Sequence, residues 1–179
     1  MTVICFGDSN TYGYDPRSYL GGRYGPEHRW VDKLAAKTGW NVSNWGENGR
    51  EIPGVPPSFP ADTQLLIVML GTNELLQGRG PDETAERMER FLAGAGLPRE
   101  RLLLVAPVPM APGEWVPEPR LASASAALAG RYRALADRLG IRFADAGNWG
   151  VRLAYDGVHF TEDGHQAFAA GLFQVLSRP

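Results

Sequence analysis

The chain has 179 residues, of which 44% are hydrophobic and 21% are charged. This length predicts one domain, residues 1–179, that can bury a substantial core, and the composition argues against disorder. The net charge of −2 offers no basic surface for nucleic acid or for an anionic membrane, so we expect neither partner.

Three features of the sequence favour a cytoplasmic protein. The longest apolar run, from Leu65 to Leu70, is too short to cross a bilayer. Only two residues precede Val3, where the first predicted strand begins, so we expect no signal peptide. The one cysteine, Cys5, cannot form an internal disulfide, which suits a reducing compartment, and we interpret it as a small core residue.

Five short segments have the composition of buried strands. Most are continuous apolar runs rather than alternating ones, which is typical of parallel strands covered on both faces. They span residues 3–6, 41–45, 64–70, 101–106 and 141–144.

Helical patterns separate these strands and follow the last one. They cover residues 28–38, 81–93 and 119–139 and the segment after Thr161. Pro81 suits the first turn of a helix, Gly140 ends the longest helix, and Thr161 suits the N-cap of the final one. The alternation of strands and helices predicts a three-layer α/β/α domain with a parallel sheet.

Two long loops are rich in residues that suit a binding crevice. Residues 15–26 contain several glycines and tyrosines, and residues 107–119 contain five prolines together with Trp115. Both loops come after a strand end or after the turn that follows it. We therefore expect them to wall a ligand crevice at the carboxyl edge of the sheet.

Ser9 directly follows the first predicted strand, in the segment Gly7-Asp8-Ser9-Asn10-Thr11. A serine at the carboxyl end of a central parallel strand lies where open α/β sheets bind their ligands. Its backbone N–H is then free to meet an anion at a helix N-terminus. The alternative is that Ser9 only caps the next helix. The segment lacks the G-x-S-x-G pattern of α/β-hydrolases.

Asp156 and His159 are three residues apart, just before the last predicted helix. At that spacing a carboxylate can reach the imidazole Nδ1, which leaves Nε2 free to take a proton from a nucleophile. A hydrogen-bonded structural histidine is the alternative interpretation. A metal site that also uses His165 is a third alternative, but the spacing fits no standard zinc motif, and we interpret His165 as an exposed or packing residue.

Two further strand ends carry candidate hydrogen-bond donors. Asn73 follows the most hydrophobic strand and can either cap a turn or point its amide into the crevice. Gly46 follows the second strand and either allows the backbone to approach a ligand closely or simply makes a turn. Together with Ser9, His159 and Asp156, these residues form a complete set of catalytic groups at one edge of the sheet.

Four segments of the sequence resemble the four blocks of the GDSL/SGNH hydrolase family, in the family's order. They are Gly7-Asp8-Ser9-Asn10, the glycine of Asn44-Trp45-Gly46-Glu47, Gly71-Thr72-Asn73-Glu74 and Asp156-Gly157-Val158-His159. The resemblance implies a flavodoxin-like fold with a five-stranded parallel sheet. It also implies that Ser9 is the nucleophile, His159 the base and Asp156 its orienting acid. The oxyanion hole would consist of the backbone N–H groups of Ser9 and Gly46 and the side chain of Asn73.

The sequence departs from the family pattern at two positions. Asn10 replaces the leucine of the family name, and Glu74 replaces the usual aspartate of the third block. Neither change removes a catalytic group. Within the family, the opening segment and the third block are most similar to bacterial arylesterases and short-chain acyl-ester hydrolases.

The function predicted from the sequence is hydrolysis of small acetyl or aryl esters through an acyl-serine intermediate, without a metal or an organic cofactor. Alternatives within the family are deacetylation of sugars and acyl transfer, and a non-catalytic flavodoxin-like binding module is the alternative from another class. The resemblance also suggests self-association of the chain. We expect Asn10, Tyr12, Trp30 and Trp115 to contact the substrate, with Tyr14 and Tyr24 as further aromatic candidates.

Overall fold

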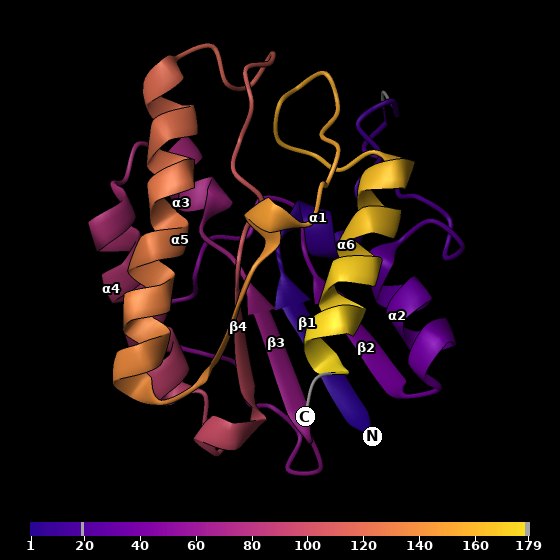
Figure 1. Cartoon of the computed structure of the whole chain (residues 1–179), viewed down its shortest axis with the longest axis vertical. Helices are drawn as coiled ribbons and strands as arrows, with labels where there is room; N and C mark the ends of the chain where they lie inside the picture. Colours follow the sequence, from indigo (N-terminus) through magenta and orange to yellow (C-terminus); the bar gives the residue numbers. More distant parts are fainter. Residues whose placement is uncertain (19, 178–179) are drawn as a thin grey trace.

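A computed structural model describes residues 1–18 and 20–177 of the chain, which form a single five-stranded sheet (Figure 1). The strands are β1 (Thr2–Gly7), β2 (Asn41–Gly46), β3 (Leu65–Met69), β4 (Leu102–Ala106) and β5 (Arg142–Asp145). Their order in the sheet is β2-β1-β3-β4-β5, and all neighbouring pairs are parallel. This is the flavodoxin-like strand order, so the predicted fold class is confirmed.

The strand positions differ from the sequence prediction by at most one residue at each end. The continuous apolar runs correspond to β1, β3 and β4 in the middle of the sheet, which are buried on both faces. The edge strands β2 and β5 are more exposed. The burial of each strand therefore follows its place in the sheet, as expected for a parallel sheet with helices on both sides.

In the described part of the chain, six α-helices connect or follow the strands. They are α1 (Ser9–Tyr12), α2 (Trp30–Thr38), α3 (Thr72–Leu76), α4 (Pro81–Gly94), α5 (Pro119–Leu139) and α6 (Glu162–Leu176), with short 3₁₀ turns at Arg99–Arg101 and Ala146–Asn148. The predictions for the four longer helices are confirmed, including Gly140 in the left-handed conformation after α5 and Thr161 as the N-cap of α6. The sequence prediction gave no bounds for α1, which it expected next to Ser9, and none for α3, because helices of four and five residues are too short to show helical periodicity.

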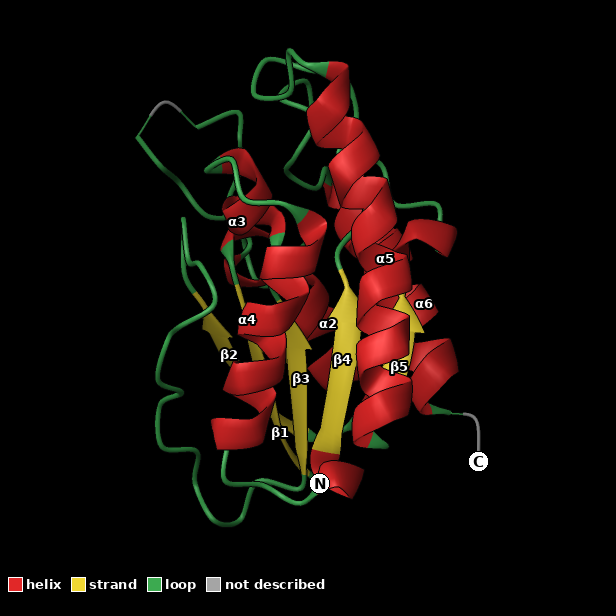
Figure 2. Ribbon diagram, turned by 90° about the vertical axis from the view of Figure 1, so that its left-hand side faces the viewer, coloured by secondary structure: helices red, strands yellow, loops and turns green. Residues whose placement is uncertain are grey.

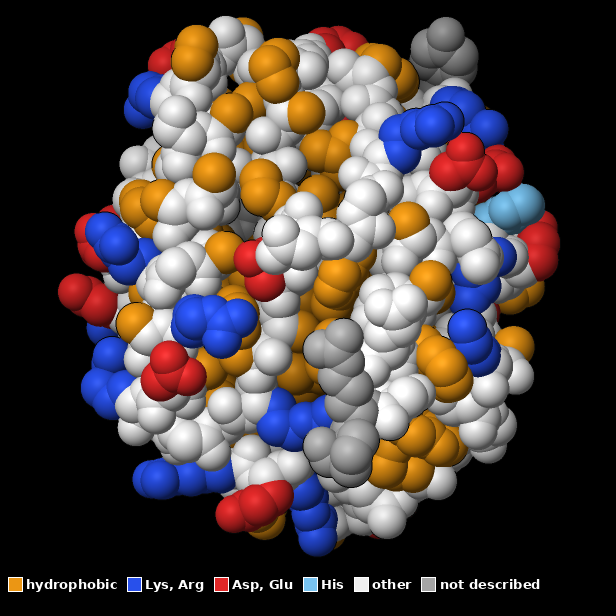
Figure 3. Space-filling view, in the orientation of Figure 1, with side chains coloured by type: hydrophobic (Ala, Val, Ile, Leu, Met, Phe, Trp, Pro, Cys, Tyr) orange, Lys and Arg blue, Asp and Glu red, His pale blue; other side chains and the backbone are white. Residues whose placement is uncertain are grey.

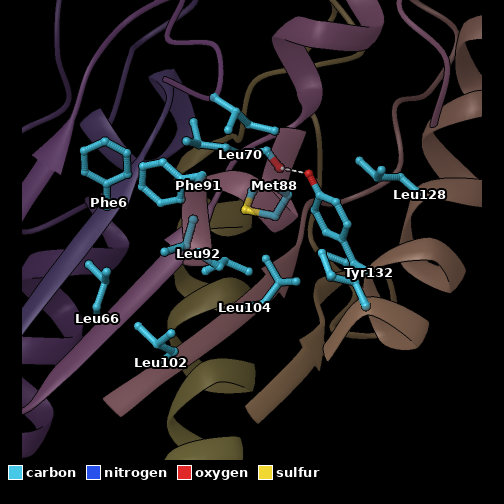
Figure 4. Packing of buried hydrophobic residues seen from close by; sticks show 14 of the residues in the cluster. Phe6, Leu66, Leu70, Met88, Phe91, Leu92, Leu102, Leu104, Leu128 and Tyr132 are labelled. Atoms are coloured by element: carbon cyan, nitrogen blue, oxygen red, sulfur yellow. Dashed lines mark hydrogen bonds between the residues drawn. The ribbon is translucent and has the colours of Figure 1, made fainter. Parts of the chain in front are cut away.

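The helices form two layers, one on each face of the sheet (Figures 1 and 2). On one face, α4 and α5 cover a core in which the rings of Phe6 and Phe91 stack with their centroids 5.2 Å apart. Figure 4 shows this core, where the buried Tyr132 hydroxyl donates a 3.0 Å hydrogen bond to the carbonyl oxygen of Leu70. On the other face, α2 and α6 contribute Trp30 and Phe168, whose rings pack 4.8 Å apart.

The charged side chains are distributed in both signs over the face in Figure 3, with acidic and basic groups next to one another around its rim. Several of them form exposed ion pairs, such as Arg138 with Glu89 and Arg152 with Asp163. Within the part of the chain that the structure describes, no helix is both long and apolar enough to cross a membrane.

Gly46 is required where β2 meets α1. A Cβ atom at this position would lie 2.0 Å from the backbone nitrogen of Tyr12, and backbone cannot yield as a flexible side chain can. Gly130, within α5, is the opposite case, because a Cβ atom there would meet no heavy atom within 4 Å outside the neighbouring backbone of its own helix.

We therefore expect opposite effects from two glycine-to-alanine substitutions. Gly46→Ala should lower the free energy of unfolding by about 3 kcal/mol, because it forces β2 and α1 apart. Gly130→Ala should raise it by about 0.5–1 kcal/mol, because alanine favours the helix and reduces the entropy of the unfolded chain. Urea unfolding of both variants measures the difference, and equal stability of the two would contradict the close approach at Gly46.

Candidate active site

The carboxyl ends of β1, β2 and β3 converge on a small cavity. Ser9 follows β1, the segment with Asn48 and Gly49 follows β2, and Asn73 follows β3. The cavity has a volume of about 160 Å³ and is lined by Ser9, Tyr14, Asn48, Gly49, Asn73, Trp115 and His159. It lies beside the switch point between β1 and β3, where open α/β sheets bind their ligands.

Ser9 occupies the first turn of α1, but it does not cap this helix. Asp8 is the N-cap, and its side chain accepts a 3.0 Å hydrogen bond from the backbone N–H of Asn10. The alternative that Ser9 serves only as a cap is therefore wrong. The backbone N–H of Ser9, at the start of the helix, has no acceptor among the described residues.

His159 joins the serine to the acid. Its Nε2 lies 3.0 Å from Ser9 Oγ, and its Nδ1 lies 2.7 Å from Asp156 Oδ2. Both ring nitrogens thus have the partners expected of a base between a nucleophile and an orienting carboxylate. The histidine is only 2% exposed, so this chain of hydrogen bonds is shielded from bulk water.

The turn before α6 fixes Asp156 in its charged form. Its Oδ1 accepts hydrogen bonds from the backbone N–H groups of Val158, at 2.8 Å, and His159, at 2.9 Å. Burial by itself would raise the pKa of Asp156, but the hydrogen bonds from the His159 ring and these two N–H groups outweigh it and lower the pKa. A charged carboxylate at Nδ1 leaves Nε2 as the nitrogen that can accept a proton.

Two aromatic side chains enclose the His159 ring. The Tyr14 ring lies 4.6 Å from the imidazole and the Trp115 ring 4.9 Å from it, measured between centroids. The backbone of the loop that carries Trp115 is hydrogen-bonded to the histidine turn, since the N–H of Trp115 donates to the carbonyl oxygen of Asp156 at 3.0 Å. The loop 107–119 therefore walls the cavity, as predicted. None of the described residues of the loop 15–26 lines it, and Tyr14, the residue just before that loop, takes its place.

Asn73 does not cap α3, because Gly71 is the N-cap residue. Its amide nitrogen donates to the carbonyl oxygen of Arg50 at 2.9 Å. An amide carries two hydrogens, so one N–H of Asn73 is left for a ligand in the cavity that the side chain lines. The same hydrogen bond holds the segment after β2 beside the end of β3.

The structure does not support Gly46 as an oxyanion donor. Its backbone N–H donates to Oδ1 of Asn44 at 2.9 Å, and Gly46 does not line the cavity. Gly49, three residues later, lines the cavity next to Ser9, and its N–H has no acceptor among the described residues. Gly49 also has a φ of 73°, a backbone conformation that favours glycine. The dipeptide Asn48-Gly49, a common turn sequence, was the available signal.

The four residues predicted to contact the substrate have different environments. Trp115 lines the cavity, as expected. Trp30 is fully buried in the core between α2 and α6, so its prediction is wrong. Asn10 is 6% exposed and its side chain is bonded to the histidine turn instead. Tyr12 lies under the guanidinium group of Arg23, 4.3 Å from its ring, and does not line the cavity. Tyr24 is also buried.

His165 is a packing residue on α6 and is not exposed. Its ring lies between those of Tyr24 and Phe160, at 5.3 Å from each, and its Nδ1 accepts a hydrogen bond from the N–H of Trp30 at 3.4 Å. Burial lowers the pKa of His165 to about 3, so the imidazole is neutral. Among the described residues, no three His, Cys, Asp or Glu side chains are grouped to hold a metal ion, so the alternative with Asp156, His159 and His165 finds no support.

The comparison with protein families identifies the family of the chain. The sequence matches the GDSL-like lipase/acylhydrolase family over residues 5–167. The chain belongs to this family. The match includes all four segments on which the resemblance was based, and the five-stranded parallel sheet agrees with it.

Solved structures of family enzymes are similar along the whole chain. The aryl esterase of M. smegmatis is 29% identical, with a TM-score of 0.81 and coverage of 98% of both chains. The carbohydrate acetylesterase Est24 of Sinorhizobium meliloti is 27% identical, with a TM-score of 0.78 and the same coverage of 98% of each chain. Among the sequences of curated proteins there is no match.

Glu74, one of the two departures from the family pattern, holds the segment that follows Gly49 in place. Glu74 is fully buried, and its Oε1 accepts a hydrogen bond from the backbone N–H of Ile52. Burial raises the pKa of Glu74, although the N–H of Ile52 and the charge of Arg87 act in the opposite direction. Asn73 and Glu74 together therefore hold the segment from Arg50 to Ile52 at the end of β3.

The buried His165 should make the protein sensitive to acid. Because its pKa is lower in the folded chain than in the unfolded chain, the unfolded chain binds the extra proton, and stability is lost as the pH falls below about 6.5. This loss should reach about 2.6 kcal/mol between pH 7.5 and 4.5. In His165→Asn, which keeps an acceptor for the N–H of Trp30 but does not titrate, this part of the pH dependence should disappear. Urea unfolding of both proteins at pH 7.5 and 4.5 tests this. If the two proteins differ in free energy of unfolding by the same amount at both pH values, the prediction is wrong.

Proposed function

We propose that this family member is a serine esterase that hydrolyses short-chain acyl esters through an acyl-Ser9 intermediate. The observation that carries this proposal is the continuous chain of hydrogen bonds from Ser9 Oγ through His159 to Asp156, beside a cavity with free N–H donors. A ligand-binding module has no need for a base at hydrogen-bonding distance from a serine hydroxyl.

In the proposed reaction, His159 Nε2 takes the proton of Ser9 Oγ as the oxygen attacks the ester carbonyl carbon. The protonated His159 then donates that proton to the leaving alcohol as the bond between the carbonyl carbon and the alcohol oxygen breaks. Water attacks the acyl-enzyme with His159 again as base, and the carboxylic acid leaves with Ser9 Oγ protonated. Asp156 stabilises the imidazolium in both steps through its hydrogen bond to Nδ1.

Three N–H groups are suited to stabilise the negative charge that forms on the carbonyl oxygen. We assign this role to the backbone N–H groups of Ser9 and Gly49 and to the side-chain amide of Asn73. Each belongs to a residue that lines the cavity, and each comes from a different strand end. Donors held in place by the backbone stabilise a developing oxyanion without reorganisation during the reaction.

The size of the cavity favours a small acyl group. At about 160 Å³, it is smaller than ordinary ligand pockets, which span roughly 300–1,000 Å³. The Trp115 and Tyr14 rings limit it on the side of His159. Acetyl esters fit this description, in agreement with the aryl esterase and acetylesterase activities named for the similar structures.

Deacetylation of a carbohydrate is the second candidate function, and one observation favours it. Trp115 lines the cavity and the residue is 47% exposed, and a partly exposed aromatic side chain can stack on a sugar ring. The chemistry at Ser9 would be the same, so the two candidates differ only in the alcohol that leaves.

Two substitutions test the catalytic roles. With an aryl acetate as substrate, Ser9→Ala should abolish hydrolysis, because no nucleophile remains. Asn73→Ala should lower kcat by about 100- to 1,000-fold, since one oxyanion donor is worth about 2.7–4 kcal/mol. Steady-state kinetics and a thermal unfolding curve for each variant separate loss of chemistry from loss of fold. Equal rates for Ser9→Ala and the unchanged protein would favour a binding module and refute the proposed function.

A third substitution tests the acyl site. Trp115→Ala should enlarge the cavity and raise the ratio of kcat/KM for a hexanoyl ester to that for an acetyl ester by about tenfold, because each added methylene gains room. Val55→Ala is the control, since Val55 is 83% exposed and does not line the cavity. If the chain-length preference is the same in all three proteins, Trp115 does not limit the acyl group.

A further inference from the structure

Asn10 makes two hydrogen bonds that bracket the proposed base. Its side-chain nitrogen Nδ2 donates to the carbonyl oxygen of Val158 at 3.0 Å, and its Oδ1 accepts from the backbone N–H of Phe160 at 2.9 Å. Val158 and Phe160 are the residues immediately before and after His159. Asn10 in turn immediately follows Ser9, so one side chain connects the serine's own helix to both sides of the histidine.

We propose that Asn10 is a positioning residue that holds His159 at hydrogen-bonding distance from Ser9; this inference rests on the proposed function. Asp156 orients the imidazole, but it belongs to the same turn as His159 and cannot fix that turn relative to α1. Asn10 supplies this second constraint. It acts through the backbone of the turn and does not line the cavity, so it is not itself a catalytic residue.

Other elements hold Asn10 rigidly in its place. Its backbone N–H donates to Asp8 Oδ1 at 3.0 Å, and its carbonyl oxygen accepts a 2.9 Å hydrogen bond from the indole N–H of Trp30 in α2. The backbone N–H of Trp30 is bonded to His165 in α6. The backbone of Asn10 is therefore anchored to the core between α2 and α6, which gives its side chain a firm base from which to hold the turn.

An amide is the side-chain group that suits this position, because it offers a donor and an acceptor at once. Leucine, the residue of the family name, has a similar size but can form neither bond. Aspartate keeps the acceptor for Phe160 but at neutral pH has no proton to donate to Val158. The departure from the family pattern at Asn10 thus corresponds to a specific link that a leucine at this position cannot make.

The test compares Asn10→Leu and Asn10→Asp with the unchanged protein, using an aryl acetate. We expect kcat to fall by about ten- to a hundredfold in Asn10→Leu and by less in Asn10→Asp, because small displacements of a catalytic group have effects of this size. KM should stay within about twofold, since the cavity keeps its lining. Tyr24→Phe is the matched control. It removes a hydrogen bond, 3.4 Å long, from another element to the carbonyl oxygen of Phe160, and its kcat should stay within about twofold.

A double-substitution experiment separates positioning from general destabilisation. In a His159→Ala background there is no imidazole to position, so adding Asn10→Leu should change the residual rate by less than about twofold. If Asn10→Leu lowers the rate by the same factor with and without His159, the residue has only a structural role and the inference is wrong. The same conclusion follows if folded Asn10→Leu keeps its full kcat. Should Asn10→Leu fail to fold, Asn10→Asp is measured in both backgrounds with the same two outcomes.

These results are distinguishable from failure of the proposed function. If Ser9→Ala hydrolyses the ester as fast as the unchanged protein does, the proposed function is refuted and the role of Asn10 falls with it. If hydrolysis depends on Ser9 and His159 but not on Asn10, only the inference about Asn10 is refuted.

Discussion

The hydrogen bond between Ser9 Oγ and His159 Nε2 joins residues that are 150 positions apart, and the rest of the site depends on it. The distance between the two atoms is set by two turns that lie far apart in the sequence. One turn connects β1 to α1 and is fixed by the Asp8 cap and by the tight fit at Gly46. The other precedes α6 and is fixed by Asp156. A parallel sheet brings these turns together because the carboxyl ends of its strands share one edge.

Most of the fold follows from the sequence because the central strands are uninterrupted apolar runs and the long helices have clear start and stop residues. Pro81, Gly140 and Thr161 mark helix boundaries through local chemistry, and local chemistry can be read without tertiary structure. The short helices α1 and α3 could not be predicted in this way. They are stabilised by packing on neighbouring elements, α1 on β1 and β2 and α3 on α4 and α5, and not by their own periodicity.

The site shows the same division between local and tertiary information. The relation of Asp156 to His159 is set by a spacing of three residues, so it could be predicted, whereas the direction of a side chain that meets distant elements could not. The side-chain oxygen of Asn44 accepts the hydrogen bond of the Gly46 N–H, so this N–H is not available to a ligand. Gly49 is the glycine that lines the cavity. Trp30 is a residue type that often contacts ligands, but here it is fully buried and packs against Phe168 of α6. Asn10 belongs to a nucleophile motif, yet its partners lie at the other end of the chain.

The carboxyl groups around the site show how one edge of a sheet can shift the pKa values of its acids in opposite directions. Burial raises the pKa of Asp8 to about 6, although hydrogen bonds from backbone N–H groups act against it, and burial also raises the pKa of Glu74. Asp156 is similarly inaccessible, but three hydrogen bonds to its oxygens lower its pKa. Asp156 differs from the other two in accepting a hydrogen bond from an imidazole, and this bond together with two backbone N–H groups outweighs the effect of burial. Asp156, whose pKa is lowered, faces Nδ1 of His159, where a negative charge stabilises an imidazolium. Asp8 and Glu74, whose pKa values are raised, are the sequence neighbours of Ser9 and Asn73, the residues to which we assign oxyanion donors.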